Sequence, residues 1–250
     1  MNIRDEAVLR ELNLYPLWVR RDAPVAAVIA PVAAVPVEEE QAVSVVPSGP
    51  VQQSSADSPI ASLDWSALKQ KVHDCTACKL RAGCTQTVFG VGDEQADWLF
   101  VGEGPGADED ARGEPFVGQA GKLLDNMLAA IKLKRGDNVY IANIVKCRPP
   151  DNRTPEPDEI TTCLPYLQNQ IALIKPKLIV ALGKTAATSL LGRDATLGSL
   201  RGTLHEYQGV PLIVTYHPAY LLRSPAEKAK AWQDLRLALH HISNRVDSSF

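Results

Sequence analysis

The sequence predicts an α/β fold in which a mostly parallel sheet carries helices on both faces. From residue 62 to residue 244, short apolar runs alternate with longer segments of helical periodicity, and this alternation is typical of βαβ units. The residues that can carry chemistry follow the apolar runs. That placement is expected when a ligand crevice lies at the carboxyl ends of parallel strands.

The expected elements follow one another in the order of such units. After a first helix and a cysteine-containing loop, the run "WLFVG" makes a strand, "VGQAGKLLDNMLAAI" opens a helix, and "VYIANIVKC" contains the next strand. The expected strands are 97–102, 138–145, 177–182 and 211–215. The expected helices are 62–73, 119–133, 156–174, 184–191 and 225–244. Four central strands between two helical layers make a three-layer sandwich.

Three regions of the chain differ in composition. Residues 1–21 can form one short helical segment. Residues 22–60 contain six prolines but no aromatic residue and no leucine. This composition cannot bury a core, so we expect a disordered linker. Residues 61–245 have the pattern of a globular protein and are expected to form the folded domain.

Charge and hydropathy exclude several classes of protein. A net charge of −3 argues against a protein that coats nucleic acid non-specifically, so any nucleic-acid contact must be a local patch. The most apolar tract, "APVAAVIAPVAAVPV", is too short for a membrane span and contains three prolines. The start "MNIRDEAVLREL" lacks the pattern of a signal peptide. We expect a cytoplasmic protein whose five cysteines are ligands or buried thiols rather than disulfides.

The turn "GEGPGADED" contains the short form of the dinucleotide-binding fingerprint, Gly-x-Gly-x-x-Ala, and Asp125 lies at a suitable distance for a ribose hydroxyl. Three carboxylates after the turn would repel a pyrophosphate. The next expected helix begins only near Gln119, so no helix N-terminus is presented to a phosphate. We therefore expect a turn whose backbone N–H groups face another ligand, with a purely structural turn as the alternative.

Four of the cysteines have the spacing of a ligand set. Cys75 and Cys78 form a C-x₂-C pair, and Cys147 and Cys163 follow far along the chain as a C-x₁₅-C pair. Four thiolates so arranged suit tetrahedral zinc or an iron–sulfur cluster, and the spacing alone does not choose between them. Independent buried thiols are the other interpretation. Cys84 is interpreted as a non-ligand.

Three further residues occupy positions where either a structural or a functional role is plausible. Phe116 lies in a glycine-flanked loop, where it is either core or a stacking platform. Asn143 lies near a strand end, and its amide either pairs within the protein or reads the edge of a nucleobase. His217 ends a buried strand and is either a satisfied core histidine or a group that projects into the crevice. The loop after it, residues 219–223, has leucines beside an arginine. Apolar side chains next to a cation suit the displacement of a base from a DNA duplex.

Taken together, these motifs resemble the family-4 (iron–sulfur) uracil-DNA glycosylases. The matching segments are GEGPG, EPFVGQAG, N-x-VKCRPP-x-NRTP, LRG-x-x-H and HPAYLLR, in the same order and spacing over roughly residues 65–240. The resemblance implies a uracil-DNA glycosylase-like fold and cleavage of the bond between uracil and deoxyribose. A covalent-adduct branch carries a basic insertion where this chain has "RPPDNRTPEP", so we place the chain in the hydrolytic branch.

The resemblance also implies roles for individual residues. Phe116 would stack on the uracil, Asn143 would read its N3–H and O4, and His217 would donate to O2, helped by the backbone N–H groups of Glu103 and Gly104. Glu103 and Glu109 are the candidates for orienting water. This chain has Gly104 where the best-known branch has a water-handling aspartate. The implied DNA contacts are Arg201, Leu221, Leu222, Arg223 and Lys228.

The family's [4Fe–4S] cluster would be held by Cys75, Cys78, Cys147 and Cys163, as a staple rather than a redox centre. The expected partner is uracil-containing DNA, bound by a monomer.

Two other classes of function stay open. One is a zinc- or cluster-stapled nucleic-acid-binding module without catalysis, and the other is a nucleotide-binding oxidoreductase. Formation of abasic sites would separate the glycosylase from the first, and retention of NAD or flavin would favour the second.

The segment "LRELNLYPLWVRR" is unexplained by the glycosylase resemblance. A helix this short is marginal alone in water, and Trp18 with several leucines has no core of its own. Either it folds back on the domain or it orders on a partner. We expect the second, with Leu17 and Trp18 as anchors. The stretch resembles the N-terminal segment of the psi subunit of the bacterial replicase clamp loader, which implies a replication-protein partner for residues 3–21.

Overall fold

The computed structural model describes residues 60–247. The segment expected at residues 1–21 and the linker expected at 22–60 lie outside these residues, apart from Ile60. The strands are β1 (Val91–Gly92), β2 (Trp98–Gly102), β3 (Val139–Asn143), β4 (Leu178–Leu182), β5 (Leu204–Tyr207) and β6 (Val210–Thr215). The α-helices are α2 (Trp65–His73), α3 (Leu80–Gly83), α4 (Ala107–Arg112), α5 (Gln119–Ala130), α6 (Pro157–Ile174), α7 (Lys184–Leu191), α8 (Leu197–Leu200), α9 (Pro218–Arg223) and α10 (Lys228–Asp247). Two 3₁₀ turns, η1 (Pro150–Asn152) and η2 (Pro225–Glu227), complete the elements.

The predicted α/β sandwich is confirmed, and the sheet is larger than expected. Its order is β1-β3-β2-β4-β6-β5. The four predicted strands form the parallel centre, while β1 and β5 add antiparallel edges. The sequence did not indicate these edges because β1 has only two residues and β5 is largely exposed. The sheet is therefore mixed and six-stranded rather than four-stranded.

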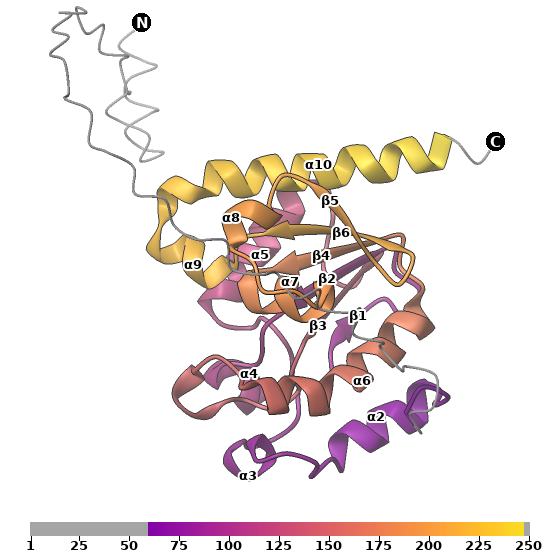
Figure 1. Cartoon of the computed structure of the whole chain (residues 1–250), viewed down its shortest axis with the longest axis vertical. Coiled ribbons are helices and arrows are strands. Elements are labelled where there is room, and N and C mark those ends of the chain that lie inside the picture. Colours follow the sequence, from indigo (N-terminus) through magenta and orange to yellow (C-terminus); the bar gives the residue numbers. More distant parts are fainter. Residues whose placement is uncertain (1–59, 248–250) are drawn as a thin grey trace, which may run out of the picture. The chain divides into compact units, whose positions relative to one another are not determined.

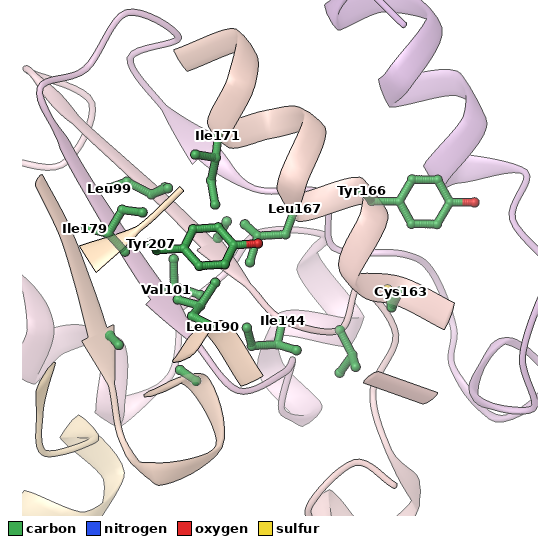
Figure 2. Close-up of a cluster of buried hydrophobic side chains, with 14 of the residues drawn as sticks. Leu99, Val101, Ile144, Cys163, Tyr166, Leu167, Ile171, Ile179, Leu190 and Tyr207 are labelled. Carbon is green, nitrogen blue, oxygen red and sulfur yellow. The ribbon is translucent and has the colours of Figure 1, made fainter. Parts of the chain in front are cut away.

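Each face of the sheet buries its own helices because successive strand residues point to opposite sides. Leu99 and Val101 face α2, α6 and α7, whereas Trp98 and Phe100 face α5 and α10. Figure 1 shows α10 along one side of the sheet, with α6 and α2 on the other. In Figure 2, Leu167 of α6 points toward the strands, and Tyr166 points away from them. These are the three layers that the sequence predicts.

The strand order reverses at β2, because β3 is added to the sheet on one side of β2 and β4 on the other. Crevices for ligands form at such switch points, outside the carboxyl ends of the strands. The segments after β2, β3, β4 and β6 all emerge at this edge. Among residues 60–247, no helix is long and apolar enough to cross a membrane.

Candidate active site

A cleft of about 490 Å³ lies at the carboxyl ends of the strands. All five residues predicted to bind uracil line it, namely Glu103, Gly104, Phe116, Asn143 and His217. They come from the segments after β2 and β6, from the last residue of β3 and from the loop before α5. The volume lies within the usual range for small-ligand sites. The sheet therefore brings together residues that are more than 100 positions apart in the chain.

Asn143 lines this cleft and has an unpaired acceptor among the described residues. It is the last residue of β3, and only 2% of it is exposed. Its Oδ1 has no hydrogen-bond partner within the described part of the chain. Gly102 makes room for the amide, because a Cβ there would lie 2.4 Å from Oδ1. A buried polar atom without a partner is costly, so this oxygen is suited to a ligand that brings a donor.

Phe116 lies beside Asn143 in a strained loop that other residues hold in place. Its φ is 56°, a region that non-glycine residues seldom adopt, and it is buried. Arg135 donates to the carbonyls of Pro115 and Phe116, at 2.9 and 2.8 Å. A Cβ at Gly121 would lie 1.8 Å from the Phe116 carbonyl oxygen, so only glycine permits this approach. Strain maintained by its surroundings is typical of ligand sites.

His217 caps α9 and faces the Phe116 ring at 5.5 Å between centroids. Its Nδ1 accepts the backbone N–H of Ala219 at 3.2 Å. In the neutral ring the proton therefore sits on Nε2. Burial lowers the pKa of His217 to about 4, and the charge of Arg223 adds to this effect. At neutral pH the ring is uncharged and offers one N–H donor.

The two predicted water-orienting carboxylates have different surroundings. Glu103 follows β2, and its Oε2 accepts the hydroxyl of Thr185 at 2.5 Å. Both oxygens of Glu109 accept backbone N–H groups, from Gly106 on one side and from Val117 and Gly118 on the other. Glu109 thus braces the start of α4 against the Phe116 loop. Of the two carboxylates, Glu103 has an oxygen without a protein donor in the described residues.

The glycine turn leads directly into a helix, which corrects the expectation that no helix begins before Gln119. Helix α4 starts at Ala107, and its first turn carries Asp108, Glu109 and Asp110. Asp110 is buried and accepts the N–H groups of Thr85 and Gln86. Asp125, the candidate for a ribose hydroxyl, pairs with Arg135 instead. These carboxylates serve the fold, and their charge opposes a pyrophosphate.

The four predicted ligand cysteines line one small cavity between α2, the α3 loop, α6 and the segment after β3, and Cys84 does not line it. Burial raises the pKa of Cys163 to about 11, and it also raises that of Cys147. The backbone N–H of Lys146 donates to Cys163 Sγ at 3.2 Å. Convergent thiols and a donor to sulfur fit a thiolate-bound cluster. Among the described residues, no three His, Cys, Asp or Glu side chains are arranged to hold a single metal ion.

Comparisons with known proteins agree with this geometry. The family model described as the uracil DNA glycosylase superfamily matches residues 89–236. A type-4 uracil-DNA glycosylase of Pyrobaculum aerophilum is 43% identical over 185 residues, covering 70% of this chain and 93% of the relative.

The chain belongs to the type-4 uracil-DNA glycosylases. The similar protein of Thermotoga maritima is 43% identical, over 65% of this chain and 85% of the relative. That of Sulfurisphaera tokodaii is 46% identical, over 63% of this chain and 76% of the relative. Both carry the description type-4 uracil-DNA glycosylase. The family resemblance predicted from the sequence motifs is confirmed.

In this type-4 glycosylase, three of the five predicted DNA contacts are exposed. Leu222 is 43% exposed on α9, Arg223 lies at the rim of the cleft, and Lys228 is exposed at the start of α10. The other two predictions need correction. Leu221 is 1% exposed, so it is buried in the protein although the next residue is exposed. Arg201 donates to buried Asp234 at 2.8 Å and stacks over Tyr216, so its charge is already paired.

Sequence reasoning missed two residues that support the glycosylase cleft. Arg135 fixes the Phe116 loop, and Thr185 binds Glu103. An arginine after a helix and a threonine in a first helical turn are common at positions without function. The position of Thr185 just after a buried strand was a usable signal, because strand ends line the crevice in this fold.

Proposed function

We propose that this chain hydrolyses the N-glycosidic bond of deoxyuridine in DNA, releases uracil and leaves an abasic site, as the first step of base excision repair. One observation carries the proposal: Asn143, whose buried Oδ1 has no partner among the described residues, lines a cleft together with Phe116 and His217. An aromatic face, an amide and a neutral N–H donor together suit a planar base with both donors and acceptors. The described relatives have this activity in their names.

Asn143 would select uracil by its hydrogen-bond pattern. Its free Oδ1 would accept from N3–H of uracil, and its amide N–H₂ would donate to O4. Cytosine has an acceptor at N3 and a donor at C4, so it would leave two buried polar groups unpaired. Such mismatched burial costs about 1–3 kcal/mol for each group. Phe116 would stack on the base, with its ring fixed by the strained loop.

His217 would stabilise the departing base. Breaking the glycosidic bond leaves negative charge on uracil and positive charge on the sugar. The Nε2–H of neutral His217 would donate to O2, where negative charge develops, together with the backbone N–H groups of Glu103 and Gly104. Preorganised donors of this kind act without reorganising during the reaction. The bond electrons go to uracil, water supplies the hydroxyl that the sugar gains, and the remaining proton of that water neutralises the uracil anion.

Glu103 would hold that water and offset the charge on the sugar. Its Oε2 is occupied by Thr185, which leaves the other oxygen for the water. Glu109 would act indirectly, because its oxygens keep the Phe116 loop in place. The Gly104 position cannot supply a side chain. A Cβ there would lie 2.7 Å from Val145, so any larger residue would disturb the cleft.

The target nucleotide must leave the duplex, because its glycosidic bond is inaccessible in the stack. Leu222 is the proposed wedge that fills the vacated space, since it is the exposed leucine of α9. Arg223 and Lys228 are the proposed phosphate contacts beside it. This local basic rim agrees with a chain whose overall charge is slightly negative.

Cys75, Cys78, Cys147 and Cys163 are the proposed ligands of a [4Fe–4S] cluster. When bound, the cluster supplies a covalent tie between the first loop of the domain and the segment after β3. The reaction transfers no electrons, so its role is structural. A zinc-stapled nucleic-acid-binding module without catalysis is the competing function. A brown protein that produces abasic sites in a uracil-containing oligonucleotide would exclude it.

The layout of the chain completes the proposal. Residues 61–245 form the glycosylase domain, and the protein works as a cytoplasmic monomer. Residues 3–21 are a tethered segment that binds a replication protein through Leu17 and Trp18. Deleting residues 1–60 should leave excision on a short oligonucleotide unchanged and abolish binding to replication proteins. A truncated protein that loses activity on the oligonucleotide would show that the segment belongs to the fold.

Asn143→Asp tests the proposed function directly. A carboxylate cannot donate to O4, so single-turnover excision of uracil should slow and discrimination against cytosine should weaken. The matched control is Asn126→Asp, an exposed asparagine on α5, which should behave as wild type. Unchanged excision and unchanged rejection of cytosine in Asn143→Asp would remove this residue from the site.

A further inference from the structure

Thr185 connects two parts of the cleft that the reaction needs. It lies in the first turn of α7, directly after β4. Its hydroxyl donates to Glu103 Oε2 at 2.5 Å, although the two residues are 82 positions apart. Between β4 and α7, Gly183 has a φ of 95°, and a Cβ there would lie 3.0 Å from Cβ of His217. The β4–α7 junction therefore packs against both Glu103 and His217.

The hydroxyl of Thr185 is available to Glu103 because it is not used by the helix. One turn later, the hydroxyl of Thr188 donates to the carbonyl oxygen of Lys184, as threonines in helices commonly do. The residue four positions before Thr185 lies in β4, so α7 offers no such carbonyl to the Thr185 hydroxyl. At the start of α7, the Thr185 hydroxyl can therefore donate to the carboxylate of Glu103, which follows β2.

A glutamate beside a cleft has several rotamers, and only some hold a water near a reacting carbon. Fixing one oxygen with a hydrogen bond removes most of this freedom before substrate arrives. The other oxygen then keeps a set direction toward the cleft. Misplacing a catalytic group by about 1 Å can cost about 100-fold in rate, so a single hydroxyl can matter without touching the substrate.

We propose that Thr185 is a positioning residue for hydrolysis: its hydroxyl fixes the carboxylate of Glu103 so that the free oxygen holds the attacking water. This inference rests on the proposed role of Glu103. It predicts an effect on the chemical step rather than on DNA binding. A direct contact between Thr185 and a DNA phosphate would have the opposite signature.

The test compares Thr185→Val, which removes the hydroxyl with little change of shape, with Thr185→Ser, which keeps it. The matched control is Thr188→Val on the same helix. We expect Thr185→Val to slow single-turnover excision at saturating enzyme about 10-fold, with the Kd for uracil-containing DNA unchanged within about twofold. Thr185→Ser should restore most of the rate, and Thr188→Val should match wild type.

A rate within about twofold of wild type in Thr185→Val would overturn the inference, as would weaker DNA binding with an unchanged saturated rate. Thr185→Ala repeats the measurement with a smaller side chain, should the valine variant fold poorly. A double-mutant cycle with Glu103→Gln separates the two proposals. No effect of Glu103→Gln would remove the role of Glu103 itself. A slow Glu103→Gln variant to which Thr185→Val adds its full effect would remove only Thr185.

Discussion

The active-site cleft and the four-cysteine cavity are both built from β3 and the residues just after it, since Asn143 at the end of β3 lines the cleft and Cys147 lines the cavity. The cleft is open, and the buried Oδ1 of Asn143 on its lining has no partner among residues 60–247. The cavity is small, and its thiols are buried or half-buried. A site for a ligand that binds and leaves keeps hydrogen-bonding capacity unused, whereas a site for a resident group closes around it.

Lys146 joins these two regions. It is fully buried, and its Nζ donates to the Asn143 carbonyl at 3.0 Å and to Gln170 Oε1 at 2.6 Å. Its own backbone N–H donates to Cys163 Sγ. Burial lowers the pKa of Lys146 to about 8, while the neighbouring Cys163 acts in the other direction. Because Lys146 contacts both Cys163 and Asn143, a substitution that disturbs the cysteine cavity should also displace Asn143.

The largest effect is therefore expected from the cysteines. Cys147→Ala and Cys163→Ala should each lower the iron content several-fold and reduce the yield of folded protein, because each removes a buried, proposed ligand. Iron analysis and the visible spectrum would measure this. Cys84→Ala is the control and should keep its iron and colour. Iron lost from the Cys84 variant but kept in both others would reverse the ligand assignment.

His217→Ala should affect only the cleft. Removing one donor from a developing anion slows chemistry about 10²–10³-fold, so single-turnover excision should fall by that factor. Iron content and binding of uracil-containing DNA should stay at wild-type values, in contrast to the cysteine variants. A rate within about twofold of wild type would exclude His217 from the reaction.

The same contrast explains what the sequence could and could not predict. Asn143 and His217 were predictable because a polar residue at the end of an apolar strand has few structural uses. The spacing of the four cysteines predicted that they converge, and they do line one cavity, while their role as ligands stays a prediction. Arg201 and Leu221 were misassigned because a motif locates a residue along the chain but does not say which way its side chain points. In the structure, Arg201 pairs with Asp234, and Leu221 is buried in the core.

The sheet edges and the supporting contacts show the same limit. Strand β1 has two residues, which is too few for a periodic pattern. Arg135 and Thr185 act through contacts made across 19 and 82 residues of chain. Such contacts depend on the packing of finished elements, so local sequence carries little information about them.

Arg135→Ala tests a supporting residue of the cleft. Without its bonds to the carbonyls of Pro115 and Phe116, the strained loop should relax and the ring should lose its fixed position. We expect the single-turnover rate to fall about 10-fold, less than for His217→Ala. Arg236→Ala, an exposed arginine on α10, is the control. Equal rates in the two variants would show that the loop keeps its conformation without Arg135.

The smallest effect concerns pH. Because burial lowers the pKa of His217 to about 4, the ring stays neutral at pH 6–8, and the saturated rate should change less than about twofold from this group over that range. NMR of histidine-labelled protein should show His217 titrating well below the ordinary value of about 6.5. The same lowered pKa of His217 also determines how the free energy of unfolding depends on pH. The unfolded chain takes up this proton first, so the contribution of His217 is intact above about pH 6.5 and is lost as the pH falls toward 4. Titration near 6.5, with a rate that drops above it, would instead identify a charged imidazole as the donor to uracil, and the neutral Nε2–H assignment would have to be abandoned.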